Sequence, residues 1–500
     1  MIRNEVGKGA VFLYIQFITS MISGYIFLIV LARITTTEII GTFSLLFSIS
    51  VIFGNIAIIG LPESIQKYVG KSFLQNRQAD AKIFVKIAFI LLSMGIIATC
   101  MVILFFEDWF SNVFGISFGL LIVVDLMISS YAVYITLYSI VVASLKTKAL
   151  PIITIISSIS KVIVSLMLIL MGYGILGLTL GYTFLGYILS SILLGIYIVK
   201  LFKSTRRISK STATLRNASK SLLVGGLVVW IPVLVTTLGI DVGTLVLYNT
   251  YGPHQSGVYF IALAIANAIK AIVLSIFTIS LPVLSSMHDG RKRFVWQTIR
   301  IGAIMALPLS SSIIFYSDDI MNLVGSSYEK GSFSLQILLL STFPILVMSG
   351  VDTLVFSYGQ YRQTLIISLA SSIPRTILYI ALVPVFGMAG VALSYTIGSG
   401  IGFIASIIVA NRIRMPVFWK PLAFTFFLPL SLSFMFATLN VDYIIGIVTT
   451  IAVTYLLSMK LHIIEKRDGS FFIEIMPNTI SKSLITISNK IEKIIDWFYG

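Results

Sequence analysis

The stretch SSISKVIVSLMLILMGYGILGLTLGY, residues 157–182, decides the class of fold. Apart from Lys161, it contains only apolar, small or uncharged side chains. About 20 mostly apolar residues are enough for a helix to cross the hydrocarbon core of a bilayer. The stretch therefore predicts a membrane-spanning helix that ends in a glycine-rich turn and carries one charged side chain within it.

The composition of the whole chain agrees with this prediction. Of its 500 residues 57% are hydrophobic and 11% are charged, and the mean hydropathy is +1.02, whereas about a quarter of the residues in a soluble domain are charged. These values exclude a soluble protein. The net charge of +16 does not indicate nucleic-acid binding, because the basic residues alternate with apolar stretches. The single cysteine, Cys100, excludes disulfides and cysteine metal sites within the chain.

The distribution of lysine and arginine predicts the topology. Fourteen apolar stretches are long enough to be candidate spans, and the first, 9–31, is too long for the core of a signal peptide. With the N-terminus inside, the inner segments hold 29 of the 35 basic residues, and the outer loops hold only Arg33 and Lys330. This asymmetry predicts an all-α polytopic membrane protein of about 14 helices with both termini in the cytoplasm.

The longest charged connection divides the chain into two halves. We predict a six-helix lobe at 1–200, a basic cytoplasmic linker at 201–220, a second six-helix lobe at 221–410, two additional helices at 411–460 and a cytoplasmic tail at 461–500.

The two halves also resemble each other in sequence. GYGILGLTLGY (172–182) matches VFGMAGVALSY (385–395), and Gly41 aligns with Gly257 in a second pair of stretches. Six spans in each half place both halves in the same orientation. The repeat is therefore predicted to be parallel, with a pseudo-twofold axis along the membrane normal.

The repeat places a cation in the fifth span of each half. At an offset of 214 residues, Lys161 aligns with Arg375. Lys161 follows Pro151, the predicted start of its helix, by ten residues, or about 15 Å, which is close to the middle of the bilayer. We predict that both cations line a central cavity. Snorkelling to the interface and pairing with Asp125 or Asp352 are the alternatives.

Two further cations are candidates for the same cavity. Lys270 lies in the eighth span on a stripe of small residues, and Arg33 follows the first span, where it could instead be an interfacial anchor. A cationic cavity of low dielectric constant favours an anionic substrate, and a phosphate group is the natural candidate. Apolar walls between helices favour an amphipathic molecule, so we expect a lipid pyrophosphate.

Three acidic residues lie in or near spans, namely Asp125, Asp241 and Asp352. They could couple transport to protons or sodium, or they could be buried partners of the cations. GYGILG (172–177) formally matches a dinucleotide-binding motif, but it lies at a turn between two spans rather than between a strand and a helix. We therefore expect no cofactor, metal site or catalytic residue.

The N-terminal region resembles the polysaccharide flippases of the Wzx type, in the superfamily that also contains MATE multidrug exporters and lipid II flippases. The resemblance rests on VLARITTTEIIGTFSLLFSISVIFGNIAIIGLPESIQKYV (30–69), and of the candidate cations only Arg33 lies in its motifs. It implies a MATE-like fold, a two-lobed bundle whose central cavity opens alternately to the two membrane faces. It also implies export of a lipid-linked oligosaccharide to the outer leaflet.

The expected function is thus a flippase, not an enzyme, for a polyprenyl-pyrophosphate-linked oligosaccharide in the plasma membrane of a prokaryote. Its expected partners are this lipid, membrane lipids and the glycan assembly machinery, with no nucleic acid. A MATE-like multidrug exporter is the alternative. A membrane-embedded glycosyltransferase or polymerase should carry a large polar loop with catalytic acids, and the sequence contains none.

The tail shows a separate helical pattern. Apolar residues recur every three or four positions from Ile480 to Phe498, with charged residues on the opposite face. This pattern predicts an amphipathic helix on the cytoplasmic membrane surface, or else a short coiled coil with a partner.

Overall fold

The computed structural model describes residues 2–75, 77–203, 215–287 and 289–461, and every regular element in these ranges is helical. The predicted tail helix and most of the predicted basic linker lie outside the described residues. The chain divides into two compact units, Met1–Phe260 and Ile261–Gly500.

The first unit contains α1 to α9, three short η segments and the first part of α10. The bounds are α1 Ile2–Ile34, α2 Thr37–Ile58, α3 Leu61–Leu74, α4 Gln78–Phe105, α5 Glu107–Phe114, α6 Phe118–Ala143, η1 Thr147–Ala149, α7 Leu150–Leu168, η2 Ile169–Tyr173, α8 Gly174–Gly181, η3 Tyr182–Ile188, α9 Leu189–Lys203 and α10 Leu215–Ser286.

The second unit begins within α10 and continues through the remaining helices. The bounds are α11 Arg291–Phe315, α12 Ser317–Val324, η4 Ser326–Gly331, α13 Ser332–Leu340, α14 Thr342–Ser357, α15 Tyr361–Arg412, α16 Trp419–Thr438 and α17 Tyr443–Lys460.

The described residues contain eleven helical segments that are long and apolar enough to cross a membrane. Three of them, 147–203, 215–278 and 361–412, have 52 to 64 residues. At about 1.5 Å per residue each would be roughly 80 Å long or more, against a hydrocarbon core of about 30 Å. Each must therefore turn back once. Counting two passes for each of the three gives the fourteen spans that the sequence predicts.

Glycines make these turns, because their backbone angles are unfavourable for other residues. Gly174 has φ 48° and ψ −122°, and Gly387, its partner in the sequence repeat, has φ 56° and ψ −131°. The two halves thus turn with nearly the same backbone geometry at aligned positions. The third long helix, α10, turns at Gly252.

The turn at Gly252 defines the position of Asp241. The sequence places Asp241 in or near a span, and α10 remains helical for eleven residues beyond it, up to Gly252. The apolar run that follows Asp241 extends the helix, so this carboxylate lies in the helix interior.

A second aligned glycine pair forms a close helix crossing in the first unit. A Cβ atom on Gly41 would lie 1.8 Å from the carbonyl oxygen of Pro253, and one on Gly257 would lie 2.0 Å from that of Thr37. The contact is reciprocal, since each carbonyl belongs to the residue four positions before the partner glycine. Here α2 and α10 approach too closely for any side chain at either glycine.

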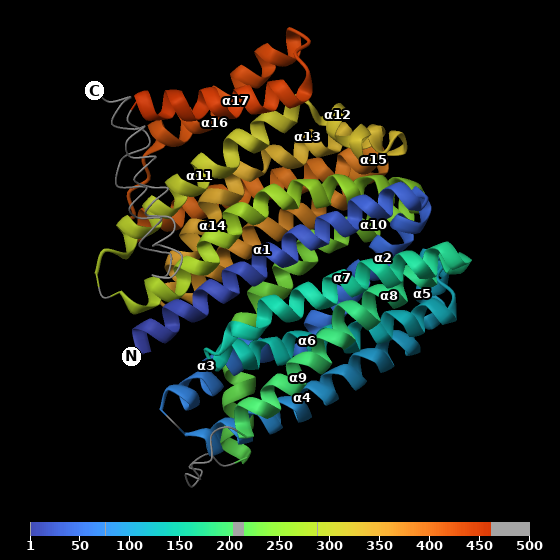
Figure 1. Cartoon of the computed structure of the whole chain (residues 1–500), viewed down its shortest axis with the longest axis vertical. Coiled ribbons are helices and arrows are strands. Elements are labelled where there is room, and N and C mark those ends of the chain that lie inside the picture. The colour runs from blue at the N-terminus through green and yellow to red at the C-terminus, as the bar shows by residue number, and fades with distance from the viewer. Residues whose placement is uncertain (1, 76, 204–214, 288, 462–500) are drawn as a thin grey trace. The chain divides into compact units, whose positions relative to one another are not determined.

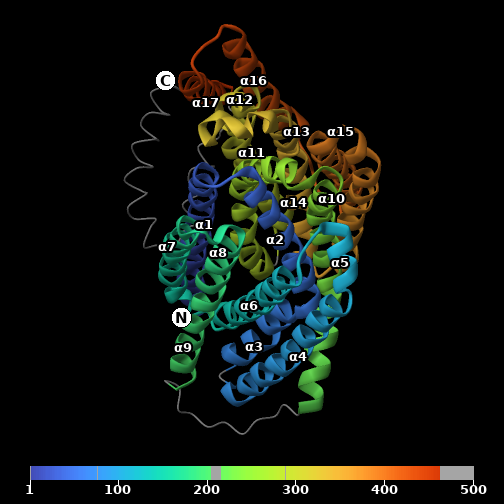
Figure 2. The same ribbon diagram turned by 90° about the vertical axis from the view of Figure 1, so that its right-hand side faces the viewer.

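Each unit has its own packing. In the first unit α6 packs against α2, α3, α4 and α9, and Figures 1 and 2 both show α3, α4 and α6 gathered together. Leu61, Ile65 and Val69 recur every four residues along α3 and are fully buried in this core. In the second unit α11 packs against α14, α16 and α17 (Figure 1).

The outer face of α4 has the composition expected next to lipid. Ile90, Met94, Ile97 and Met101 follow one another at spacings of three and four, and each is at least 50% exposed. An apolar stripe of this kind would be costly in water but not in a bilayer.

Candidate functional site

Lys161, the cation of the fifth span, is buried among aromatic rings in the first unit. It lies in α7, only 9% exposed. Its Nζ atom is 4.5 Å from the ring centroid of Tyr182 and 4.9 Å from that of Phe27. Both distances are in the range of cation–π attraction, which is worth about 2 kcal/mol when the cation is desolvated. Among the described residues, the Lys161 ammonium contacts these two rings and no carboxylate. The structure therefore does not support pairing of Lys161 with Asp125.

Local structure fixes this arrangement. Pro151 stands in the first turn of α7, where its missing N–H costs nothing. Ser23 of α1 donates a hydrogen bond to Ser158, one turn before Lys161, at 2.9 Å. Tyr182 begins the π-helix η3, an irregularity that often marks functional positions. Gly186 in η3 leaves room for the lysine stem, since a Cβ atom there would be 3.3 Å from its Cδ.

Arg375, the aligned cation of the second unit, also lies over a tyrosine. It is 3% exposed in α15. Its guanidinium carbon is 4.2 Å from the ring centroid of Tyr395, and Nη2 donates a hydrogen bond to Ser399 Oγ at 2.9 Å. Gly398 makes this possible, because a Cβ atom there would be 2.6 Å from the Cβ of Arg375.

The two sites correspond position by position. Lys161 and Arg375 differ by 214 residues, and Tyr182 and Tyr395 by 213. In each half, therefore, the cation of the fifth span lies on the tyrosine of the sixth. The structure brings together residues that the sequence analysis did not single out, although both tyrosines end the two matched stretches.

Lys270 makes the site in the second unit different. It is 2% exposed, and its Nζ atom lies 4.2 Å from the centroid of the same Tyr395 ring. Two cations thus share one ring. Within the described residues, the Lys270 ammonium has no hydrogen-bond partner. An uncompensated buried charge costs several kcal/mol, so this cluster, defined as Lys270, Arg375 and Tyr395, is suited to an anion.

The remaining candidates lie elsewhere in their units. Arg33 is exposed in the last turn of α1. Asp125 in α6 lies beside Cys100, whose Sγ is 3.8 Å from Ser129 Oγ. Asp241 in α10 lies beside Ser48, and Asp352 in α14 lies beside Thr364. That these residues and the cations share one cavity stays a prediction.

One acidic residue was missed by the sequence analysis. Glu63 follows Pro62 at the start of α3, and burial raises the pKa of its carboxyl. It and Asp241 are both in electrostatic range of the Tyr131 hydroxyl. Its position in GLPES, directly after the helix-starting proline, was the available signal. Among the described residues no group of three or more His, Cys, Asp or Glu side chains could hold a metal ion.

The sequence matches one known protein family. The family model described as "Polysaccharide biosynthesis protein" matches residues 6–288, more than half of the chain. A search of curated proteins gives no match.

Solved structures share the fold at low sequence identity. The lipid II flippase MurJ in an inward closed conformation is 18% identical with a TM-score of 0.68, over 90% of this chain and 98% of its own. An outward-facing MATE multidrug transporter has 15% identity and a TM-score of 0.61, over 82% and 96%. An inward-facing MATE transporter has 15% identity and a TM-score of 0.58, over 79% and 94%.

Proposed function

The chain belongs to the family of polysaccharide biosynthesis proteins, and from this premise we propose that it is a flippase for a lipid-pyrophosphate-linked oligosaccharide. It moves this lipid from the cytoplasmic to the outer leaflet of a prokaryotic plasma membrane, where it supplies the assembly of surface glycans. Both termini are on the cytoplasmic side.

One observation carries the choice of an anionic substrate. Lys270 and Arg375 are both almost fully buried and share the Tyr395 ring, and the Lys270 ammonium has no hydrogen-bond partner among the described residues. A pyrophosphate offers several acceptor oxygens and the opposite charge. Charge-assisted hydrogen bonds to such an anion are about twice as strong as neutral ones.

The other candidate residues take supporting roles in this proposal. Lys161 with Tyr182 is a second, weaker anion contact, and Arg33 is a contact outside the buried sites. Transport proceeds by alternating access, in which the two lobes rock around the substrate. Asp125, Asp241 and Asp352 are the candidates for coupling to protons or sodium.

A MATE-like exporter of cationic drugs is the second candidate, because it has the same fold. The buried cation cluster disfavours it, since Lys270 and Arg375 would repel a cationic substrate in a medium of low dielectric constant. The similar solved structures described above are a flippase and two transporters, and they give no support to a membrane-embedded glycosyltransferase.

Reconstitution separates the two transport functions. The full chain in proteoliposomes is given a fluorescent lipid-pyrophosphate oligosaccharide, and an impermeant quencher measures the fraction in each leaflet. We expect translocation that protein-free vesicles lack. An absence of translocation, together with proton- or sodium-driven efflux of a cationic dye from the same vesicles, would assign the protein to the multidrug branch.

A further inference from the structure

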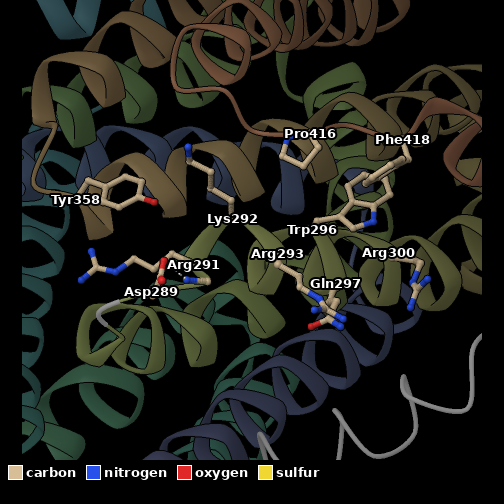
Figure 3. Close-up of a pocket in the computed structure, with 11 residues that line it drawn as sticks. Asp289, Arg291, Lys292, Arg293, Trp296, Gln297, Arg300, Tyr358, Pro416 and Phe418 are labelled. Carbon is tan, nitrogen blue, oxygen red and sulfur yellow. Dashed lines mark hydrogen bonds between the residues drawn. The ribbon is translucent and has the colours of Figure 1, made fainter.

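A basic pocket lies at the N-terminal end of α11 in the second unit (Figure 3). Its volume is about 650 Å³. Three segments form it: the start of α11, the turn between α14 and α15, and the connection from α15 to α16. The side chains that the argument uses are Arg291, Lys292, Arg293, Trp296, Arg300 and Phe418.

Four of the lining side chains are cationic and one, Asp289, is acidic. Asp289 accepts a hydrogen bond from the backbone N–H of Gly290 at 3.0 Å. Arg291 is held in place, because it donates to the carbonyl oxygens of Met287 and Ser357 at 2.8 Å each. It positions the wall of the pocket and is not free to bind a ligand.

Lys292 and Arg293 are available to a ligand. Within the described part of the chain, no hydrogen bond or ion pair links either side chain to another residue. Arg293 and Arg300 are seven residues apart on α11, so they lie on the same face of the helix, and Figure 3 shows them projecting to one side. Arg300 is only 9% exposed, so its charge lies in surroundings of lower dielectric constant than water.

The wall on the side of Lys292, opposite Arg293 and Arg300, is aromatic (Figure 3). The rings of Trp296 and Phe418 have centroids 5.1 Å apart, and Phe418 is 53% exposed while Trp296 is 7% exposed. The pocket therefore combines cations with an exposed apolar edge. A free inorganic anion would use only the cations, whereas an amphipathic anion would use both walls.

The location of the pocket indicates the source of such a molecule. It opens where two apolar helices begin, α11 at Arg291 and α16 at Trp419. Both beginnings belong to segments that the lysine and arginine distribution places on the cytoplasmic side. Aromatic residues gather at the level of lipid headgroups, and basic pockets between spans on this side are suited to anionic lipids.

We propose that this pocket binds the phosphate headgroup of an anionic phospholipid from the cytoplasmic leaflet. Lys292 and Arg293, which Figure 3 shows on opposite sides of α11, flank the headgroup and attract its phosphate, and Trp296 and Phe418 pack against the glycerol and the first methylenes. The lipid would bridge α11 and the connection to α16. This inference rests on the proposed cytoplasmic orientation but not on the proposed transport, because the substrate site uses other residues.

Lipid binding to the purified full chain tests the proposal. Phosphatidylglycerol and phosphatidylcholine with identical acyl chains are titrated in detergent, and bound lipid is counted by native mass spectrometry. The test variant is Lys292→Gln with Arg293→Gln. The matched control is Arg216→Gln with Lys220→Gln, which removes the same two charges from exposed positions in the other unit.

We expect phosphatidylglycerol to bind at least about tenfold more tightly than phosphatidylcholine, from about 1 kcal/mol for each cation. The test variant should lose this preference, and the control should keep it. A variant that exchanges the two residues, Lys292→Arg with Arg293→Lys, conserves both charges and should also keep it. Inorganic pyrophosphate at the same concentration should not displace the lipid. Equal losses in test and control variants, or displacement by pyrophosphate, would overturn the assignment to a lipid headgroup.

Discussion

The cation of the fifth span lies on a tyrosine in both halves of the molecule, but the surroundings of the two pairs differ. Lys161 has a second ring, Phe27, on its other side. Arg375 has a hydroxyl from Ser399, and its tyrosine carries a second cation, Lys270. The position aligned with Ser399 in the first half is Gly186.

The difference shows how one repeat can serve two roles. In the first half a single cation is compensated by two aromatic rings, so it can remain buried without an anion. In the second half one ring is shared by two cations, and the Lys270 ammonium has no hydrogen-bond partner among the described residues. We infer that the second half holds the anion most strongly and that the first half contributes less.

Loss of Arg375 should have the largest effect. Arg375→Gln removes a charge and the charge-assisted hydrogen bond that we propose it donates to the substrate's pyrophosphate. A hydrogen bond of this kind is worth about 1.5–3 kcal/mol. The initial rate of lipid translocation should therefore fall about 10- to 100-fold in the proteoliposome assay. Arg362→Gln is the control, because it removes an exposed arginine from the start of the same helix. Equal losses in the two variants would show that only the charge of the helix matters.

Replacing Lys270 should change thermal stability and the rate of transport in opposite directions. In Lys270→Met a buried ammonium without a hydrogen-bond partner among the described residues becomes an apolar side chain of similar length. Replacing buried charged groups by apolar ones can stabilise a protein by about 1–4 kcal/mol. We expect a higher midpoint of thermal unfolding without substrate, together with slower translocation. A lower midpoint would mean that the ammonium is compensated in the folded protein.

Substitutions in the first half should have smaller effects on translocation. Phe27→Leu removes one of the two rings beside Lys161, which costs about 0.5–2 kcal/mol of cation–π attraction. Stability should decrease by this amount, and translocation should slow less than about tenfold. If Phe27→Leu slowed transport as much as Arg375→Gln, the proposed ranking of the two halves would be wrong.

The smallest effect is expected from making the first half resemble the second. Gly186→Ser introduces the hydroxyl that Ser399 supplies to Arg375, at a position where a Cβ atom meets only the Cδ of Lys161 at 3.3 Å. The lysine stem is flexible, so a shift of a few tenths of an ångström accommodates it. Translocation should change less than about threefold, while Ser399→Ala, the reverse loss, should slow it more.

Much of the fold could be predicted from the sequence, because the length of apolar stretches, the glycines at turns and the basic loops can be recognised without knowing which residues are in contact. The fourteen spans and the aligned turns at Gly174 and Gly387 are of this kind. The sequence left open whether the helix extends past Asp241, because an apolar run does not show where a helix turns. The backbone angles of Gly252 place this turn.

The candidate site was predicted only in part for a related reason. Lys161 and Arg375 could be found because a charge in an apolar stretch is conspicuous. The meeting of Lys270 with Arg375 depends on packing between residues 105 positions apart. Tyrosines and serines are common in membrane helices, so neither Tyr395 nor Ser399 could be recognised before its neighbours were known.

The most direct test of the account is a comparison of two substrates in the same vesicles. One is a lipid-pyrophosphate oligosaccharide, and the other carries the same lipid and glycan through an uncharged linker. We predict that the unmodified protein moves the charged lipid at least about tenfold faster, and that Lys270→Met with Arg375→Gln abolishes this preference. An unchanged preference in the double variant would contradict the assignment of Lys270 and Arg375 as the anion site.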